Sequence, residues 1–311
     1  MIKKTIISLI LSMTLISPLT HAENTIADNK HSHKYYEKAA SRGNANALYQ
    51  LGRMYYFGEG VDQNYIKAKD LWKESAEKGH ALAQYNLGTM IYESEINGAD
   101  QDYSLVIKLW KKSAEQGNPD ALYELGRMYY FGEGVDQNYI KAIDLWKESA
   151  EKGHALAQYN LGTMIYESEI NGADQDYSLV IKLWKKSAEQ GNPDAQYNLA
   201  VMYADGVKLT LDYKKAIDLY IKAAEQGNSH AQFNLGVIYE FGMGTPKNQT
   251  LANEWFLKSA NNNNIHAQMD IAMKYYDGLK GLPKDINQAR FWLIKAAANG
   301  NDQAKLMLSK I

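Results

Sequence analysis

The histidines are the side chains best suited to acid–base catalysis or metal binding here, because the chain contains seven His and no Cys. His31 and His33 could share a metal ion, but a zinc site takes three or four protein ligands, and a two-histidine tract is more typical of a polar tail. No repeated Ser, Asp or Glu accompanies the other histidines in the manner of a catalytic triad. The other histidines are His21, His80, His154, His230 and His266.

Motifs for other chemistry are also missing from the sequence. It contains no His-Glu-x-x-His helix, no P-loop and no Gly-rich dinucleotide turn. Glu93 and Glu95 could form an acid–base pair, but they stand in a predicted loop, where paired acids are usually solvated charge. We therefore predict no enzyme activity, no catalytic or metal-binding residue, no cofactor and no small-molecule substrate.

Tyrosine and arginine recur with a spacing that suits protein binding. Tyr49, Arg53 and Tyr56 are separated by four and three residues, which places them on one face of a helix. Tyr and Arg are enriched among the residues that contribute most binding energy at protein interfaces. We name the repeated set the tyrosine–arginine stripe and predict that it binds a partner protein. Its members are Tyr49, Arg53, Tyr56, Tyr85, Thr89, Tyr92, Tyr123, Arg127, Tyr130, Tyr159, Thr163 and Tyr166.

The first tyrosine of each set has a second interpretation, which is packing between adjacent helical hairpins. This alternative applies to Tyr49, Tyr85, Tyr123, Tyr159 and Tyr197. Other members of the stripe have less reason to be buried, and for them binding is favoured. They are Arg53, Arg127, Tyr56 and Tyr130.

An internal repeat carries this stripe. The segment that begins at Ala47 reads A-L-Y-Q-L-G-R-M-Y-Y-F-G-E-G-V, and its first Ala recurs every 36 or 38 residues up to Ala267. Apolar residues at helical spacing predict a first helix over about 45–56 and a second over about 65–78, with Asn64 as the cap of the second. Gly58 between them can take the positive φ that ends the first helix.

Small residues inside each repeat indicate close helix packing. Gly52 and Ala76 have almost no side chain, so the two helices can approach closely. One hairpin cannot bury both its faces, so neighbouring hairpins must stack. We therefore predict an all-α protein, a right-handed α-solenoid of helix-turn-helix repeats whose first helices line a concave groove.

A second symmetry relates two pairs of repeats. Residues 47–118 and 121–192 match at a shift of 74 and differ at two positions, Gln50 against Glu124 and Lys69 against Ile143. Two adjacent repeats were therefore copied as a block. Selection by a fast-changing partner and neutral slippage both explain such a copy.

The repeat resembles the Sel-one-like repeat family, a relative of the tetratricopeptide repeats. The family frame is A-x-A-x-x-x-L-G-x-x-Y-x-x-G-x-G-V, then K-A, an aromatic residue, A-A and G, and this sequence matches it from Ala45 to Gly300. Residues 93–100 and 167–174 depart from the frame as insertions expected in hairpin loops. The resemblance implies partner recruitment without chemistry, and its exported bacterial members are linked to envelope assembly, host interaction and neutralisation of toxic effectors.

The first 22 residues have the layout of a secretory signal peptide. Lys3 and Lys4 precede an apolar run, and Thr20 and Ala22 supply small residues before a cleavage point. The run of about 14 residues is shorter than the roughly 20 that span a bilayer. We expect a periplasmic or secreted protein without a membrane span after cleavage. Removing residues 1–22 removes two Lys and changes the formal net charge from −2 to −4, which gives no support for nucleic-acid binding.

The predicted organisation follows from these boundaries. It comprises a signal peptide (1–22), a flexible segment (23–33), an N-terminal capping helix (34–44), repeats 1 to 7 (45–80, 81–118, 119–154, 155–192, 193–228, 229–264 and 265–301) and a C-terminal capping helix (302–311).

The function that this organisation favours is an exported, non-enzymatic scaffold that recruits or restrains a partner protein through its concave groove. The alternatives are an immunity protein that neutralises a secreted effector toxin, a virulence factor that binds a host protein, and a structural protein of the envelope. A hydrolase is the least favoured alternative, because no set of residues forms a catalytic constellation.

Overall fold

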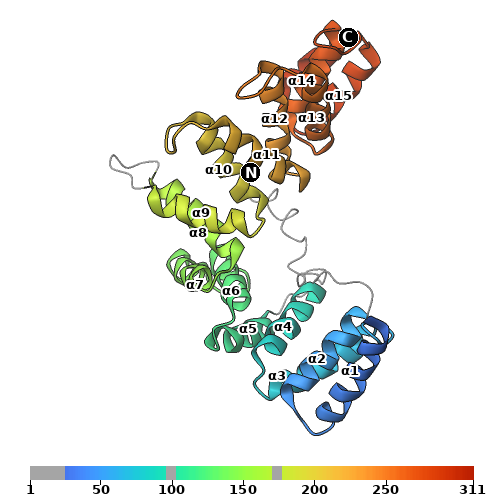
Figure 1. Ribbon diagram of the computed structural model, residues 1–311, viewed down its shortest axis with the longest axis vertical. Helices are drawn as coiled ribbons and strands as arrows, with labels where there is room; N and C mark the ends of the chain where they lie inside the picture. The colour runs from blue at the N-terminus through green and yellow to red at the C-terminus, as the bar shows by residue number, and fades with distance from the viewer. Residues whose placement is uncertain (1–24, 96–102, 170–176) are drawn as a thin grey trace. The chain divides into compact units, whose positions relative to one another are not determined.

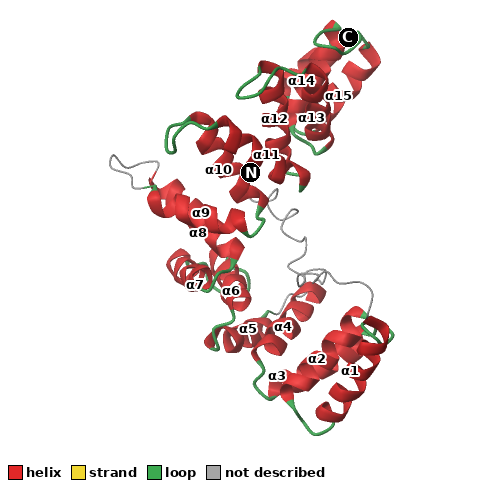
Figure 2. Cartoon of the chain, viewed as in Figure 1, coloured by secondary structure: helices red, strands yellow, loops and turns green. Residues whose placement is uncertain are grey.

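The protein is all-α. The computed structural model describes residues 25–95, 103–169 and 177–311, and these ranges contain sixteen helices and no strand (Figure 1, Figure 2). The helices are α1 (Thr25–Ala40), α2 (Ala45–Phe57), α3 (Tyr65–Glu77), α4 (Ala81–Glu95), α5 (Ser104–Glu115), α6 (Pro119–Phe131), α7 (Tyr139–Glu151), α8 (Ala155–Glu169), α9 (Ser178–Glu189), α10 (Pro193–Asp205), α11 (Tyr213–Glu225), α12 (Ser229–Phe241), α13 (Gln249–Asn261), α14 (Ile265–Asp277), α15 (Ile286–Ala298) and α16 (Asp302–Leu308).

Some predicted features lie outside the described residues. The signal peptide, residues 1–22, is one of them. The predicted insertions 93–100 and 167–174 are another, apart from their first residues, which extend α4 to Glu95 and α8 to Glu169.

The helices belong to two compact units, which are described here one by one. The first unit ends at Gln116 and contains α1–α5. The second begins at Gly117 and contains α6–α16. Within each unit, consecutive helices pack on one another, so the neighbours in sequence are also the neighbours in space.

The helix boundaries follow from capping side chains, of which Asn64 was predicted. Asn44 Oδ1 accepts a hydrogen bond from the Ala47 amide at 2.9 Å and so starts α2. Asn64 does the same for α3, again at 2.9 Å, from the amide of Lys67. Gly58 ends α2 with a φ of 73°, a left-handed conformation that glycine adopts at little cost. The predicted Asn64 cap and the glycine stop are therefore confirmed.

Close packing within five of the seven hairpins depends on a glycine that faces an aromatic ring. A Cβ added at Gly126 would lie 2.4 Å from Nε1 of Trp146. The indole is 2% exposed and donates its N–H to the backbone oxygen of Tyr123 at 3.1 Å. Gly52 and Trp72 repeat the arrangement in the first unit, with a distance of 2.5 Å from the added Cβ. The predicted close approach of the two helices is confirmed.

Adjacent repeats are joined by buried glutamines. Gln158 on α8 is 2% exposed and donates to the backbone oxygen of Ala150, the last but one residue of α7, at 3.0 Å. The bond adds a side-chain donor to a carbonyl at a helix end, which also accepts from the Gly153 amide at 3.0 Å. Four further glutamines donate in the same way to the preceding second helix: Gln84, Gln196, Gln232 and Gln268.

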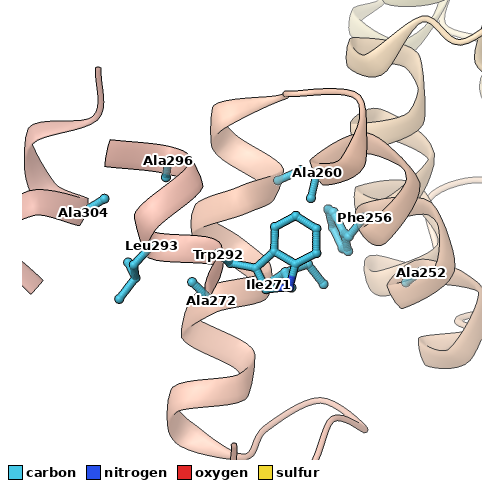
Figure 3. Packing of buried hydrophobic residues seen from close by; sticks show 10 residues of the cluster. Ala252, Phe256, Ala260, Ile271, Ala272, Trp292, Leu293, Ala296 and Ala304 are labelled. Carbon is cyan, nitrogen blue, oxygen red and sulfur yellow. The ribbon is translucent and has the colours of Figure 1, made fainter. Parts of the chain in front are cut away.

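The last apolar cluster of the second unit ends beneath α16. Figure 3 shows this cluster, where Phe256 of α13, Ile271 of α14 and Trp292 of α15 are buried among small alanines. Ala304 of α16 is fully buried on the same cluster. The short final helix therefore covers an apolar surface that the last hairpin would otherwise expose.

The N-terminal helix is longer than the sequence predicts. We expected a flexible segment over 23–33 and a capping helix over 34–44, but α1 begins at Thr25. Ala40 and Tyr36 pack against Leu51 of α2. His33 extends the contact, since its Nε2 lies 3.4 Å from the hydroxyl of Tyr55. The local sequence of these residues does not predict a helix. Contact with α2 stabilises the helical conformation there.

The glycine–aromatic contact predicts how adding a methyl group at the glycine affects stability. Gly126→Ala should lower the free energy of unfolding by about 1–3 kcal/mol through overpacking against Trp146. Trp146→Leu should relieve this cost, because Ala272 and Leu293 occupy the equivalent positions of repeat 7 without conflict, both fully buried. Urea unfolding of both single variants and the double variant measures the coupling. Strictly additive losses would contradict the proposed contact.

Candidate functional site

The first tyrosines of the stripe are structural in two repeats. Tyr49 is 6% exposed and Tyr123 is 2% exposed. Their rings stack on His80 and His154, the residues before the next first helices, with centroids 4.6 and 4.5 Å apart. The packing interpretation therefore describes these two side chains, and they lack the exposure that a binding surface needs.

Tyr85 and Tyr159, the corresponding tyrosines of repeats 2 and 4, are half-buried. Their backbone oxygens accept the indole N–H of Trp110 and Trp184 at 3.2 and 3.3 Å. Burial raises the pKa of Tyr159, and nearby Asp194 adds to the shift. These tyrosines thus combine packing with partial access to solvent.

The last tyrosine of each set remains accessible while its ring is held in place. Tyr56 is half-buried, and its ring lies 5.1 Å from that of Trp72 and 5.2 Å from that of Tyr65. Tyr130 repeats these contacts with Trp146 and Tyr139 at 5.3 and 5.2 Å. The corresponding residues of repeats 2 and 4, Tyr92 and Tyr166, are also half-buried and lie 5.4 and 5.3 Å from Trp110 and Trp184.

Thr89 and Thr163 occupy the middle positions of the stripe in repeats 2 and 4, and both are half-buried. The Thr89 hydroxyl donates to the backbone oxygen of Tyr85 at 3.1 Å, a local bond within α4. These side chains present little polar surface for a partner.

The two arginines differ in their surroundings although both are half-buried. Arg127 donates from Nη1 to Glu124 Oε2 at 2.7 Å, and Glu133 Oε2 lies 4.0 Å from its Nη2. Burial raises the pKa of Glu124, and the positive charge of Arg127 opposes that shift. The guanidinium of Arg53 lies 5.8 Å from the centre of the Phe57 ring. The Nε atoms of both arginines are buried without a hydrogen-bond partner among the described residues.

Second helices of repeats 2 and 4 carry exposed lysines. Lys108, Lys111 and Lys112 on α5 are exposed, and so are their copies on α9, Lys182, Lys185 and Lys186. Within the described ranges no group of three or more His, Asp and Glu side chains could hold a metal ion. No helix of those ranges has the length and apolar content to cross a bilayer.

Comparison with known proteins agrees with the hairpin geometry. The Sel1 repeat family model matches residues 23–44, 45–80, 81–118, 119–154, 155–192, 193–228, 229–264 and 265–301. The chain belongs to the Sel1 repeat family. The family model matches eight repeats, one more than the seven predicted, and α1 lies within the additional match at residues 23–44. Sel1 repeat proteins are protein-interaction scaffolds, and no enzymatic family is indicated.

Two solved structures show the same fold. A protective antigen present in uropathogenic Escherichia coli strains is 36% identical, with a TM-score of 0.71, and the match covers 88% of this chain and 58% of that protein. A Sel1 repeat protein from Oxalobacter formigenes is 26% identical, with a TM-score of 0.65, covering 93% of this chain and 82% of that one. A Sel1-like repeat-containing protein of Schizosaccharomyces pombe is 35% identical over 54 residues, which are 17% of this chain and 8% of that protein. The chain thus spans a little over half of the first protein and a small part of the third.

A buried ionic cluster in repeats 6 and 7 departs from the Sel1 frame. Lys274 on α14 is 4% exposed. Its Nζ lies 2.6 Å from both Glu240 Oε2 and Asp270 Oδ2 and 3.8 Å from the centre of the Phe256 ring. Lys280 pairs with the other oxygen of Glu240. Burial raises the pKa of Glu240, but the hydrogen bonds and charges of the two lysines outweigh it, and the pKa falls below its usual value.

This cluster was not predicted from the sequence, although a signal was present. The position of Lys274 holds an apolar residue in every other repeat: Met54, Met90, Met128, Met164, Met202 and Ile238. A lysine at a core position indicates a buried carboxylate nearby, since an unpaired buried charge is strongly unfavourable. Glu240, which replaces the tyrosine found at Tyr56 and Tyr130, supplies it.

The cluster predicts a large effect of one substitution and its repair by a second. Lys274→Met should lower the free energy of unfolding by about 3–5 kcal/mol, because it removes one partner of a buried ion pair. The double variant Glu240→Tyr with Lys274→Met restores the residues of the other repeats and should recover at least the wild-type value. Urea unfolding measures both. A double variant as unstable as the single one would show that the cluster does more than pair charges.

Proposed function

We propose that this chain is an exported, non-enzymatic scaffold that recruits or restrains a partner protein through the first helices of its Sel1 repeats. The observation that carries the proposal is the repeated display of half-buried tyrosines on these helices, Tyr56 and Tyr92 in one unit and Tyr130 and Tyr166 in the other. Each ring lies against an indole of its own repeat.

Rings held in this way suit protein binding for a physical reason. Ordering a flexible side chain at an interface costs about 0.5–1.5 kcal/mol, and a ring already fixed by its neighbours avoids much of that cost. Tyr also combines a large apolar surface with a hydroxyl group, which explains its frequency at binding hot spots. The surface is therefore preorganised for a partner.

Export is part of the proposal and rests on the first residues. Two lysines, a short apolar run and small residues before a cleavage point form a signal-peptide pattern at residues 1–22. The absence of Cys makes folding independent of disulfide formation after export. A periplasmic location follows, and release from the cell would require a further step.

Binding of a host protein is a second candidate function. It is favoured by the similarity to the protective antigen present in uropathogenic Escherichia coli strains. The matched part is 58% of that protein, so its role transfers to this chain as a proposal only.

Export predicts a defined mature chain. Expression of the complete sequence in a Gram-negative host should give periplasmic protein that begins at Glu23, as read by mass spectrometry of the N-terminus. Replacing Lys3 and Lys4 by Glu should leave the precursor in the cytoplasm, because the signal needs a positively charged start. Equal periplasmic amounts of both forms would contradict the signal peptide.

The binding surface predicts a position-dependent crosslink. A photoreactive benzoyl-phenylalanine in place of Tyr56 should capture one main protein partner in intact cells or in the presence of host cells. The same residue in place of Lys111, which is exposed on α5 of the same unit, serves as the control and should capture little. Mass spectrometry of the products names the partner. Capture from neither position in either setting would contradict the scaffold function, and equal capture from both would contradict the choice of surface.

A further inference from the structure

The two nearly identical halves of the duplication provide an internal comparison of charge. Repeat 3 carries Asp120 and Glu124 on α6, where repeat 1 carries the neutral amides Asn46 and Gln50 on α2. The arginine of each repeat is retained at the same position. Replacement of both carboxylates by amides therefore changes the surroundings of one arginine and leaves the backbone frame unchanged.

In repeat 3 the guanidinium charge is balanced inside the protein. Glu124 Oε2 accepts from Arg127 Nη1 at 2.7 Å, and the side chains of Glu124 and Arg127 are 16% and 20% exposed. A partly buried, charge-assisted hydrogen bond of this length compensates much of the positive charge of Arg127. The other acid, Asp120, lies 3.3 Å from Nε2 of His154.

In repeat 1 the guanidinium lacks such a partner. No carboxylate of the described residues lies within 4.0 Å of Arg53. Phe57 is the aromatic ring near its charge, at 5.8 Å. The Nε atoms of Arg53 and Arg127 are both buried without a hydrogen-bond partner among the described residues, so the carboxylate is what distinguishes the two arginines. A half-buried cation with one unsatisfied donor gains more from an incoming anion than a fully solvated one does, because part of its desolvation has already occurred.

The neighbours of Arg53 indicate what kind of anion fits. Tyr49 and Tyr56 lie one turn away on either side of it along α2, and Tyr56 presents a partly accessible ring. A flat guanidinium beside an aromatic ring matches a carboxylate side chain flanked by apolar residues. A polyanion such as a nucleic acid would instead call for several clustered cations, and the formal net charge of the chain is −2.

We infer that Arg53 is the anchoring residue of the binding surface in the first unit, and that it receives an Asp or Glu side chain from an acidic segment of the partner protein. The inference rests on the proposed scaffold function and names the chemistry of its partner. Arg127, at the equivalent position, is already paired and contributes less.

The duplication itself supplies the test variants. Gln50→Glu copies residue 124 into repeat 1 and should pair Arg53 internally, three residues away on the same helix. Lys69→Ile copies the other difference, at a position that is exposed on α3, and is the matched control. Both residues occur in the same frame in the natural copy, so both variants should fold, which circular dichroism and thermal melting verify.

The experiment selects binders of the mature chain from a displayed library of random twelve-residue peptides. The selected peptides should share an acidic residue. We expect Gln50→Glu to weaken the affinity of a labelled selected peptide roughly tenfold or more, since it removes a charge pair at a binding hot spot. Lys69→Ile should leave the affinity unchanged. A peptide with Lys in place of its acid should in turn bind Arg53→Glu better than it binds the wild type.

Each other outcome overturns the inference. Selected peptides without a common acid, or equal affinity for wild type and Gln50→Glu, would show that Arg53 is not the anchor, while the scaffold function would stand. A library that yields no binder would exclude a linear acidic segment. In that case the crosslink from position 56 decides separately whether the scaffold function also fails.

Discussion

Contact between a first-helix glycine and a second-helix aromatic ring is the constraint on which the hairpins depend. In repeat 3 the Trp146 ring occupies the space that a Cβ of Gly126 would fill, and its N–H satisfies the backbone oxygen of Tyr123. The contact fixes how closely the helices approach, and hence which residues are turned inward. Where the second-helix residue is Leu293, the facing position tolerates Ala272. The pair of facing residues is therefore matched in volume, as dense packing requires.

The same contact prepares the proposed binding surface. The indole between the helices also contacts the tyrosine at the end of the first helix. In repeat 1, for example, the rings of Tyr56 and Trp72 lie 5.1 Å apart. The ring is then fixed by the core and still meets solvent. Stability and recognition are thus connected, because the residue that closes the hairpin also orients a candidate contact residue. Since five of the seven repeats each form the contact separately, single repeats can change their surface without disturbing the others.

The repeats differ from one another in their charged residues and in how these are paired. Arg127 is neutralised by Glu124, whereas the amide of Gln50 leaves Arg53 without a carboxylate in ion-pair distance among the described residues. In repeats 6 and 7 a charged residue lies in the core itself: Lys274 is buried there and pairs with Glu240. A buried pair of this kind adds little net stability but penalises any packing that separates its members. Such pairs distinguish otherwise similar neighbours along the array.

Periodicity in the sequence by itself determined the all-α repeat architecture, the helix boundaries and the close approach at Gly52, because each depends on local spacing, caps and residue size. It did not determine which stripe residues are accessible. Tyr49 and Tyr56 have equivalent patterns, yet one stacks on His80 and is buried while the other meets solvent. That difference arises from the next repeat, which local spacing does not describe. The helical start of α1 and the pairing of Lys274 with Glu240 likewise depend on contacts between different helices, so only the tertiary structure decided them.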